Sequence, residues 1–335
     1  MYCNLIWPNA GEHNMKCIKC EAPAFTKLLT SNTPLCRKHY VEYIEKKVRY
    51  AIKKHNMFSY NDKIAVAYSG GKDSTVLLHV LHKIEQRYPK SELFAVIVDE
   101  GISGYRDQAL RIALKNVKLL GIPYEIVSFK DLFTHTLDEI VLEVKQTPKK
   151  LTACTYCGVF RRRAIDIGAK SLGATKVATG HNLDDEVQTF LLNLVRGDIK
   201  RIGRLSPSYS GMDAFIPRVK PLRYVSEREI VLYALAKNLE FHSDPCPYSS
   251  TSTRNEVREF INKAEIRIPS VRENLLAAFD IISPLLRKNI SDASIKRCKK
   301  CGAPTSSDLC QVCKLLESIP KMRNFNIGNK IPPSK

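Results

Sequence analysis

The sequence predicts an α/β protein with a doubly wound parallel sheet, flanked by a small metal-binding module at each end. Apolar runs alternate with segments of helical periodicity between about residues 58 and 240. Such alternation is typical of parallel sheets that helices cover on both faces. A glycine turn follows the first apolar run, and four metal-ligand residues lie near each end of the chain. We therefore expect three parts, at residues 1–57, 58–290 and 291–335.

The first predicted helix covers residues 41–58. Val41, Ile44 and Val48 share one face, and most lysines lie elsewhere around the helix. We interpret it as a basic connector between the N-terminal module and the sheet. A solvated helix face would explain the charge equally well.

The sheet and its covering helices follow from four apolar runs. Strands are expected at 63–68, 93–101, 124–129 and 176–180, and helices at 73–86, 105–120, 160–174, 183–197 and 226–240. The second of these helices is closed by Gly121 and Pro123. Because ligands of such sheets bind at the carboxyl ends of the strands, the residues after each strand are the candidate site.

Composition narrows the class of partner. The chain has 335 residues, 44% hydrophobic residues and a formal net charge of +19, which favours nucleic acid over the alternative of a merely basic protein. No secretory signal is visible, and the apolar run at 93–98 is too short to cross a membrane. We expect a cytoplasmic protein without a membrane partner, in which eleven cysteines indicate metal sites or catalysis.

The turn after the first strand, AVAYSGGKDST at 65–75, predicts a phosphate site. It is not a Walker A loop, because position 66 is valine. Gly70 and Gly71 let backbone amides approach an anion, and the next helix directs its positive end there. Ser69 and Ser74 add hydroxyl groups, and Lys72 adds charge. The alternative is an ordinary turn between strand and helix.

The string TGHNLDDEVQTFLLNLVRGD at 179–198 follows a later strand. Asp184 and Asp185 come after His181 at the start of a helix. Their carboxylates could bind Mg²⁺ or position a substrate group. Simple helix capping is the alternative.

Two groups of cysteines have the spacing of closed zinc sites. They are Cys17, Cys20, Cys36 and His39 near the start, and Cys298, Cys301, Cys310 and Cys313 near the end. Four such ligands are typical of structural Zn²⁺. Cys3 is left out because it lies far from Cys17. These modules could bind nucleic acid or serve as scaffolding.

Cys154, Cys157 and Cys246 remain. They could be inert thiols, a thioredoxin-like redox pair of Cys154 and Cys157, persulfide carriers, or ligands of an iron–sulfur cluster. Clusters normally take four protein ligands. Three would leave one iron open to an exogenous sulfur, as an open catalytic zinc binds water.

The SGGKDS string resembles the pyrophosphate loop of the PP-loop ATPases, which split ATP between the α- and β-phosphates. The resemblance implies that the loop holds the β- and γ-phosphates, together with Mg²⁺. The nucleotide-binding residues it implies are Ala67, Ser69, Gly70, Gly71, Lys72, Asp73, Ser74, Asp99, Arg161, Gly180 and Asp185.

A second resemblance covers nearly the whole chain. CTYCGVFRRRAIDIGA, VDEGISGYRDQAL, LVRGDIKRIGR, IPRVKPLRY and EREIVLYA are similar to segments of the cytoplasmic tRNA 2-thiolation proteins. In the wider group, cysteines that match Cys154, Cys157 and Cys246 hold a [4Fe-4S] cluster in some members, and other members are argued to use persulfides. The implied catalytic residues are these three cysteines, Lys72 and Asp185.

The target uridine is inferred from two strings. VDEGI and CGVFRRRA favour the branch that modifies the wobble uridine over the branch that modifies the T-loop uridine. The T-loop branch has a lysine where this chain has Arg161. Arginine keeps its charge and suits phosphate binding better than proton transfer.

The resemblance implies an ATP-dependent tRNA-uridine 2-sulfurtransferase that adenylates the C2 oxygen of the wobble uridine and replaces it with sulfur. Alternatives are the T-loop uridine, a PP-loop amidating or lysidine-type ligase, and a zinc-finger RNA-binding protein without catalysis. Expected partners are tRNA, a sulfur donor (sulfide or a ubiquitin-like thiocarboxylate protein), and a second copy or a related paralogue. The arginines expected to bind tRNA phosphates are Arg161, Arg162, Arg163, Arg201, Arg204 and Arg218.

Overall fold

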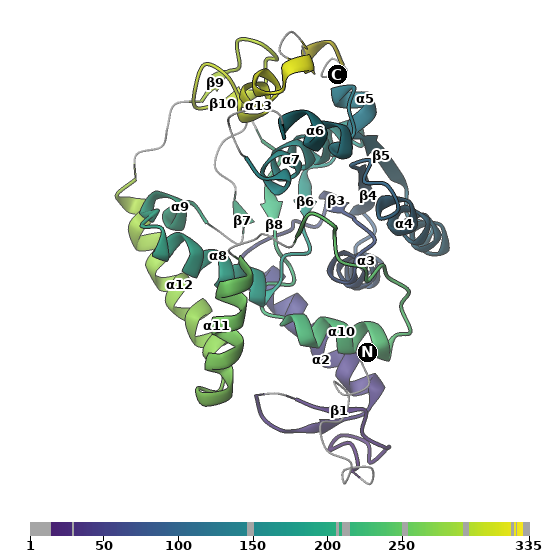
Figure 1. The fold of residues 1–335 in the computed structure, drawn as a ribbon. Coiled ribbons are helices and arrows are strands. Elements are labelled where there is room, and N and C mark those ends of the chain that lie inside the picture. The colour runs from purple at the N-terminus through teal and green to yellow at the C-terminus, as the bar shows by residue number, and fades with distance from the viewer. Residues whose placement is uncertain are drawn as a thin grey trace.

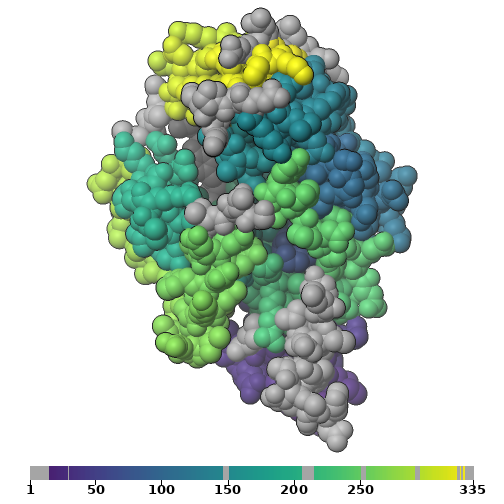
Figure 2. Space-filling model, viewed as in Figure 1, coloured from purple at the N-terminus to yellow at the C-terminus, as the bar shows by residue number. Residues whose placement is uncertain are grey.

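Figure 1 shows the computed structural model, which describes residues 15–330 except 29, 146–150, 206–207, 210–214, 250–253, 291–294, 323–324 and 326. A six-stranded sheet lies at the centre. The chain's two terminal modules lie at opposite ends of the molecule (Figures 1 and 2). None of the described helices is long and apolar enough to cross a membrane. Cys3 lies outside the described residues, and so does the expectation about it.

The sheet confirms the predicted class. Its strands, in spatial order, are β5 (Tyr124–Ser128), β4 (Glu92–Asp99), β3 (Lys63–Ala67), β6 (Lys176–Ala178), β8 (Arg218–Val219) and β7 (Ser208–Tyr209). The first five are parallel, and β7 is an antiparallel edge strand. The chain winds outward from β3 to β5 and then returns to β6 on the other side of β3. The carboxyl ends of β3 and β6 therefore form a topological switch point, where such sheets bind ligands.

Alternate residues of each central strand enter two different cores. Ile64 and Val66 of β3 pack with α2 (Arg37–Lys54), α3 (Lys72–Glu85), α4 (Arg106–Leu120) and α10 (Glu227–Ala236). Ala65 enters the opposite core, with α5 (Phe129–Phe133), α6 (Leu137–Val144) and α7 (Ala153–Ser171). This two-residue alternation places one helical layer on each face of the sheet.

The helix α7 begins earlier than predicted. The predicted segment at 160–174 excludes the cysteine pair, but the helix starts at Ala153. Tyr156, Phe160 and Ala164, which are four residues apart, are all fully buried. Their helical spacing includes the pair, so both cysteines lie within the first turns of α7.

Four helices form a separate lobe beside the sheet. They are α8 (Leu183–Val195), α9 (Ile199–Arg204), α11 (Arg254–Arg267) and α12 (Val271–Lys288). Val187, Phe190 and Phe279 lie in its core, and the two phenylalanine rings stack with centroids 5.0 Å apart. We predicted only α8 of this lobe. The lobe closes over the carboxyl end of β6, since α8 follows that strand directly.

Each terminal module is a hairpin followed by a helix. The first hairpin is β1 (Thr26–Lys27) with β2 (Pro34–Leu35), which leads into α2. The second is β9 (Lys296–Arg297) with β10 (Pro304–Thr305), followed by α13 (Gln311–Ser318), η2 (Pro320–Met322) and η3 (Ile327–Lys330). Helix α13 packs against α7, which joins the C-terminal module to the sheet.

Candidate active site

The phosphate loop joins β3 to α3 at the switch point. Gly70 has a φ of +83°, and a Cβ atom there would lie 2.5 Å from the carbonyl oxygen of Ala109. Both the left-handed backbone and the close approach therefore require glycine. Gly71 is the N-cap of α3, and no side chain caps this helix end. Its first backbone N–H groups and the helix dipole can therefore serve an anion.

Lys72 is held at the loop by two acids. Its Nζ atom lies 2.8 Å from Glu227 Oε1 and 3.1 Å from Asp73 Oδ2. Burial opposes its charge, but Asp73 and Glu227 outweigh this effect and raise the pKa of Lys72 to about 12. Lys72 is thus a fixed cation at the mouth of the loop.

Loop hydroxyls bond to each other. The Oγ atoms of Ser69 and Ser74 lie 3.0 Å apart, and the Ser69 N–H donates to Ser74 Oγ at 3.2 Å. These two contacts hold the phosphate loop against the first turn of helix α3.

The end of β6 meets the first turn of α3. A Cβ atom at Gly180 would lie 3.1 Å from the backbone nitrogen of Ser74, so glycine permits this approach. Asn182 donates its side-chain amide to Asp73 Oδ1 at 2.9 Å. Asn182 also forms a capping box with Asp185 at the start of α8. The two predicted strings, one from each strand, are therefore in direct contact.

The two aspartates of the second string have different roles. Asp184 accepts hydrogen bonds from the backbone of Glu227 and from Arg272, both at 2.7 Å, so it caps α10 and holds α12. Asp185 takes part in the capping box, and its other oxygen accepts a hydrogen bond from Arg254 at 3.0 Å. Asp185 therefore caps its own helix and also lies beside Asp73, whereas Asp184 contacts the start of α10.

The local electrostatics at Asp73 and Asp185 suit a divalent cation. Burial raises the pKa of both carboxyl groups, and each stays raised although Lys72 and Arg254 oppose the shift. The negative charge of Asp185 adds to the rise at Asp73. Two partly buried carboxylates thus lie near each other, each with one cationic partner, and carboxylates are the ligands that Mg²⁺ prefers.

The three middle cysteines lie on two elements beside this loop. Cys154 and Cys157 are in the first turns of α7, and the Cys154 thiol donates to the carbonyl oxygen of Tyr248 at 3.4 Å. Cys246 lies on the segment after α10. The backbone of this segment pairs with the phosphate loop, because the His242 N–H donates to the Gly70 carbonyl at 2.8 Å. The chain thus brings Cys246 between the loop and α7.

A row of charged side chains connects the phosphate loop to Cys157. Arg106 donates to the carbonyl oxygen of Ser69 at 2.7 Å, and its Nε atom lies 3.1 Å from Glu100 Oε2. The other oxygen of Glu100 lies 2.9 Å from Arg161 Nε, and Arg161 donates to Cys157 Sγ at 2.9 Å. We call Arg106, Glu100 and Arg161 the arginine–glutamate relay.

We did not predict Arg106 or Glu100. The only signal was the pair of acids after β4, and we predicted its neighbour, Asp99. Asp99 accepts a hydrogen bond from the backbone of Gly101 at 2.9 Å, which is a local turn contact. Glu100 and Arg106 are instead 5% and 3% exposed, so this part of the relay is buried, whereas the Arg161 side chain is 46% exposed.

The relay also sets the charge around Cys157. Burial raises the pKa of the Cys157 thiol, although the Arg161 charge opposes the shift. Burial likewise raises the pKa of Cys246. Burial opposes the charge of Arg161 as well, but Glu100 and Cys157 raise its pKa. The two thiols are therefore protonated at neutral pH unless a metal binds them, since a metal ligates the thiolate.

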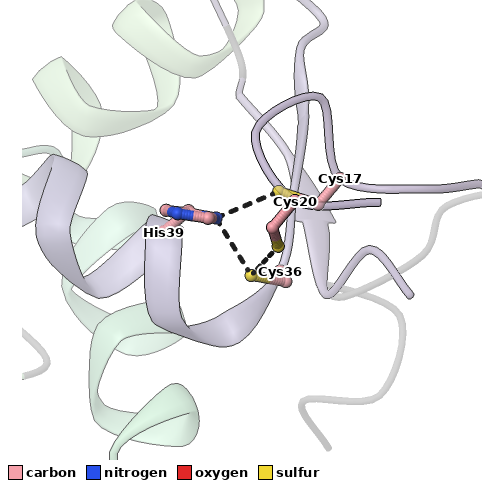
Figure 3. Close-up of side chains that lie close together, drawn as sticks. All are labelled: Cys17, Cys20, Cys36 and His39. Carbon is pink, nitrogen blue, oxygen red and sulfur yellow. Dashed lines mark hydrogen bonds between the residues drawn. The ribbon is translucent and has the colours of Figure 1, made fainter. Parts of the chain in front are cut away.

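The two outer clusters have the geometry of single-ion sites. Figure 3 shows Cys17, Cys20, Cys36 and His39 converging on one point. The Cys20 and Cys36 sulfurs lie 3.6 Å apart, and His39 Nδ1 lies 3.3 Å from Cys17 Sγ. In the C-terminal cluster, Cys298–Cys313 and Cys301–Cys310 are both 3.7 Å apart. Thiolates on a tetrahedral zinc, with Zn–S of about 2.3 Å, lie about 3.8 Å apart. Both clusters can therefore bind a metal.

The sheet and loop define the class of protein. The PP-loop domain family matches residues 41–265. Two similar proteins and one solved structure narrow the class of protein. A cytoplasmic tRNA 2-thiolation protein 1 of Chlamydomonas reinhardtii is 39% identical, over 90% of this chain and 84% of its own. The tRNA 2-thiolation protein NcsA of Haloferax volcanii is 37% identical, over 91% and 99%.

A solved structure agrees with these relatives. The U34-tRNA thiolase NcsA of Methanococcus maripaludis, with its [4Fe-4S] cluster, superposes with a TM-score of 0.77. It is 32% identical, over 91% of this chain and 96% of that chain. The chain belongs to the tRNA 2-thiolation protein family. This membership confirms the resemblance to the tRNA 2-thiolation proteins that was inferred from the sequence. It also confirms the expected class of enzyme, a tRNA sulfurtransferase that uses ATP.

Proposed function

We propose that the protein is an ATP-dependent tRNA-uridine 2-sulfurtransferase acting on the wobble uridine. The observation that carries the proposal is the arginine–glutamate relay, which joins Ser69 of the phosphate loop to Cys157 through successive contacts of 2.7–3.1 Å. Adenylation of the C2 oxygen and attack of sulfur on C2 must take place at the same uridine, and this arrangement sets their two sites side by side. The relatives' printed names support tRNA as the substrate.

The phosphate loop suits the first half of the reaction. The C2 oxygen of uridine attacks the α-phosphate of ATP, and pyrophosphate leaves. The amide groups at the α3 N-terminus and Lys72 would bind the β- and γ-phosphates, and Asp73 with Asp185 would hold Mg²⁺. Such fixed charges stabilise the transition state without reorganising during the reaction.

The middle cysteines suit the second half. A hydrosulfide attacks C2, and AMP leaves with the former carbonyl oxygen. The C2 oxygen alone would be a very poor leaving group, so adenylation makes the exchange possible. Holding the sulfur beside the activated carbon converts a bimolecular step into a step within one complex.

The residues fit a [4Fe-4S] cluster better than a zinc ion. Among the described residues, Cys154, Cys157 and Cys246 are not one of the groups whose ligand atoms all lie within 4.8 Å of one another. Wider spacing suits a cluster, because each thiolate binds a different iron atom. The cluster would offer an open iron for the incoming sulfur. A similar protein with its cluster, at 32% identity, supports this assignment.

An anaerobic thiolation assay tests the proposal. Purified protein, unmodified tRNA, ATP and sulfide should give 2-thiouridine together with AMP and pyrophosphate. Mass spectrometry of tRNA digests should place it at the wobble position; placement in the T-loop would overturn the proposed position. A PP-loop ligase would keep its activity when the three cysteines are replaced by alanine, and that result would overturn the chemistry.

The proposed boundaries are the N-terminal module at 1–57, the catalytic domain at 58–290 and the C-terminal module at 291–335. We assign Zn²⁺ to both outer clusters and propose a cytoplasmic location, as the relatives' names indicate. Metal analysis of the purified protein should give two zinc ions for each chain.

A further inference from the structure

A cavity separate from the phosphate loop lies between α7, strand β8 and the C-terminal module. Its volume is about 600 Å³, and it is lined from one side by α7 and from the others by β8, the end of α9 and the second zinc module. None of the ATP-loop residues or the middle cysteines lines it. We call it the α7–ribbon cavity.

Three arginines of this cavity have no acidic partner. Arg162, Arg163 and Arg204 form no ion pair with a carboxylate in the described part of the chain. The cavity's other two cations are already neutralised. Arg218 pairs with Asp166 at 2.7 Å and Lys220 pairs with Glu186 at 2.6 Å.

The arginines that the sequence predicts to bind tRNA phosphates therefore differ in whether they have an acidic partner. Arg161 is engaged in the relay, and Arg201 pairs with Asp198 at 3.0 Å. Neither of them lines the cavity. The uncompensated charge is therefore concentrated at Arg162, Arg163 and Arg204.

Two observations show that this charge calls for an anion. Burial lowers the pKa of Arg162, and the neighbouring charges of Arg218, Arg161 and Arg201 lower it further. The Nε atom of Arg163 is buried and has no hydrogen-bond partner among the residues that the structure describes. A buried, unpaired guanidinium nitrogen is costly, and a phosphate oxygen would satisfy it.

The cavity also has an apolar part. Val159, Ile216 and Pro304 line it, together with the ring of Phe215, which is 39% exposed. Aromatic and apolar side chains of this kind bind unstacked bases of single-stranded RNA. Arginines from α7 and α9, together with an aromatic ring, offer contacts for both the phosphate and the base of a nucleotide.

The cavity and the sulfur site share helix α7. Cys157 and Arg162 are five residues apart on α7, which is about 7.5 Å along a helix axis. At about 100° per residue, Cys157 is turned by about 140° from Arg162, so the two sites lie on different faces of the helix.

We propose that the α7–ribbon cavity binds one single-stranded nucleotide of the substrate RNA, outside the site of the target uridine, with its phosphate on Arg162, Arg163 and Arg204 and its base against Phe215. The proposal rests on the proposed function, which supplies tRNA as the RNA. It assigns the C-terminal zinc module a part in RNA binding, because that module forms one wall.

Salt-dependent binding tests the phosphate contacts. The affinity of full-length protein for unmodified tRNA is measured by fluorescence anisotropy at several salt concentrations. In the double variant Arg162→Gln/Arg204→Gln, affinity should fall about 10-fold or more, and the slope of log K against log salt should flatten by about 1.4, or about 0.7 for each lost contact. Arg111→Gln, an exposed arginine on α4, is the matched control and should change affinity less than about twofold.

Ultraviolet crosslinking tests the base contact. Mass spectrometry should find an RNA nucleotide joined to the peptide that contains Phe215, and Phe215→Ala should remove this product. Unchanged zinc content and melting temperature establish that each variant is folded. A double variant with the slope of Arg111→Gln, or a loss of ATP affinity with tRNA binding intact, would overturn the proposal.

Failure of the proposed function would look different. Wild-type protein that binds tRNA with the expected slopes but makes no 2-thiouridine would overturn the function and support the cavity. Wild-type protein that thiolates tRNA while the double variant binds as the control does would overturn the cavity alone.

Discussion

The outer and middle cysteines are built on opposite plans. Each outer cluster has four ligands, and its sulfur atoms face one another at 3.6–3.7 Å. The middle cysteines instead contact other groups: Cys154 contacts the carbonyl of Tyr248, and Cys157 contacts Arg161. The outer sites therefore stabilise small modules, whereas the middle site is connected to charged residues that reach the phosphate loop. Four ligands are expected at a structural metal site, whereas three cysteines leave a position open for a reacting group.

The largest effect should come from breaking the middle site. Cys246→Ala should reduce tRNA thiolation by about 100-fold or more, because it removes a ligand of the sulfur-carrying group. The two zinc ions and the melting temperature should change little. Thiolation gels and metal analysis measure both, and full activity in this variant would erase the distinction between the two kinds of site.

The reverse pattern is expected at an outer site. Cys313→Ala should release one zinc ion and unfold the C-terminal module, since zinc binding supplies several kcal/mol of its stability. Proteolysis and differential scanning calorimetry report this loss. If the module stays folded without zinc, the closed cluster is not the scaffold that its geometry indicates.

A smaller effect should come from the relay. Glu100→Gln removes the charge that holds Arg161 and Arg106 and should lower thiolation by about 10- to 100-fold, the range for residues that orient ligands. Iron content should be kept, which separates positioning from ligation. Glu256→Gln, an exposed glutamate on α11, is the control and should leave thiolation unchanged.

The smallest effect concerns acid stability, which has to be separated from loss of zinc. His55 accepts a hydrogen bond from Arg223 at 2.9 Å, and burial together with the Arg223 charge lowers its pKa to about 4. Unfolded histidine binds a proton near pH 6.5, whereas folded His55 resists until about pH 4. The free energy of unfolding should therefore fall between pH 6.5 and 4 by about 1–2 kcal/mol from this group, after allowance for solvent screening.

Denaturant titrations of wild type and His55→Gln at several pH values measure this contribution. Zinc loss in acid is common to both proteins and cancels in the difference. An equal slope in both would place all acid sensitivity in the zinc sites.

The sequence was sufficient where chemistry depends on short spacing. Gly70, Gly71 and the two outer groups of four metal-ligand residues were identified because each set lies within a short stretch with one dominant interpretation. Strands β3, β4, β5 and β6 were predicted from their apolar runs, whereas the two-residue strands β7 and β8 were not. The start of α7 was missed, since we ended the helical pattern at the cysteines although Tyr156 continues it.

Long-range pairs were the part that could not be predicted. Arg161 is distant in the chain from Glu100 and Arg106, and nothing in a single sequence says which of many charges meet. Asp184 and Asp185 are adjacent, yet one holds α10 and the other faces Asp73, because α8 turns them in different directions. The lobe of α11 and α12 was also missed, since much of its surface is charged.

The hydrogen bond between His242 and Gly70 has a consequence for how mutants of this protein should be interpreted. The segment that carries Cys246 is anchored on the same peptide unit that turns the phosphate loop. A substitution at Gly70 therefore disturbs both segments, and the cause of inactivity in a Gly70 variant is identified only when ATP binding and the proposed cluster are both assayed. Genetic screens that sort inactive alleles into nucleotide and sulfur classes would place such alleles in both.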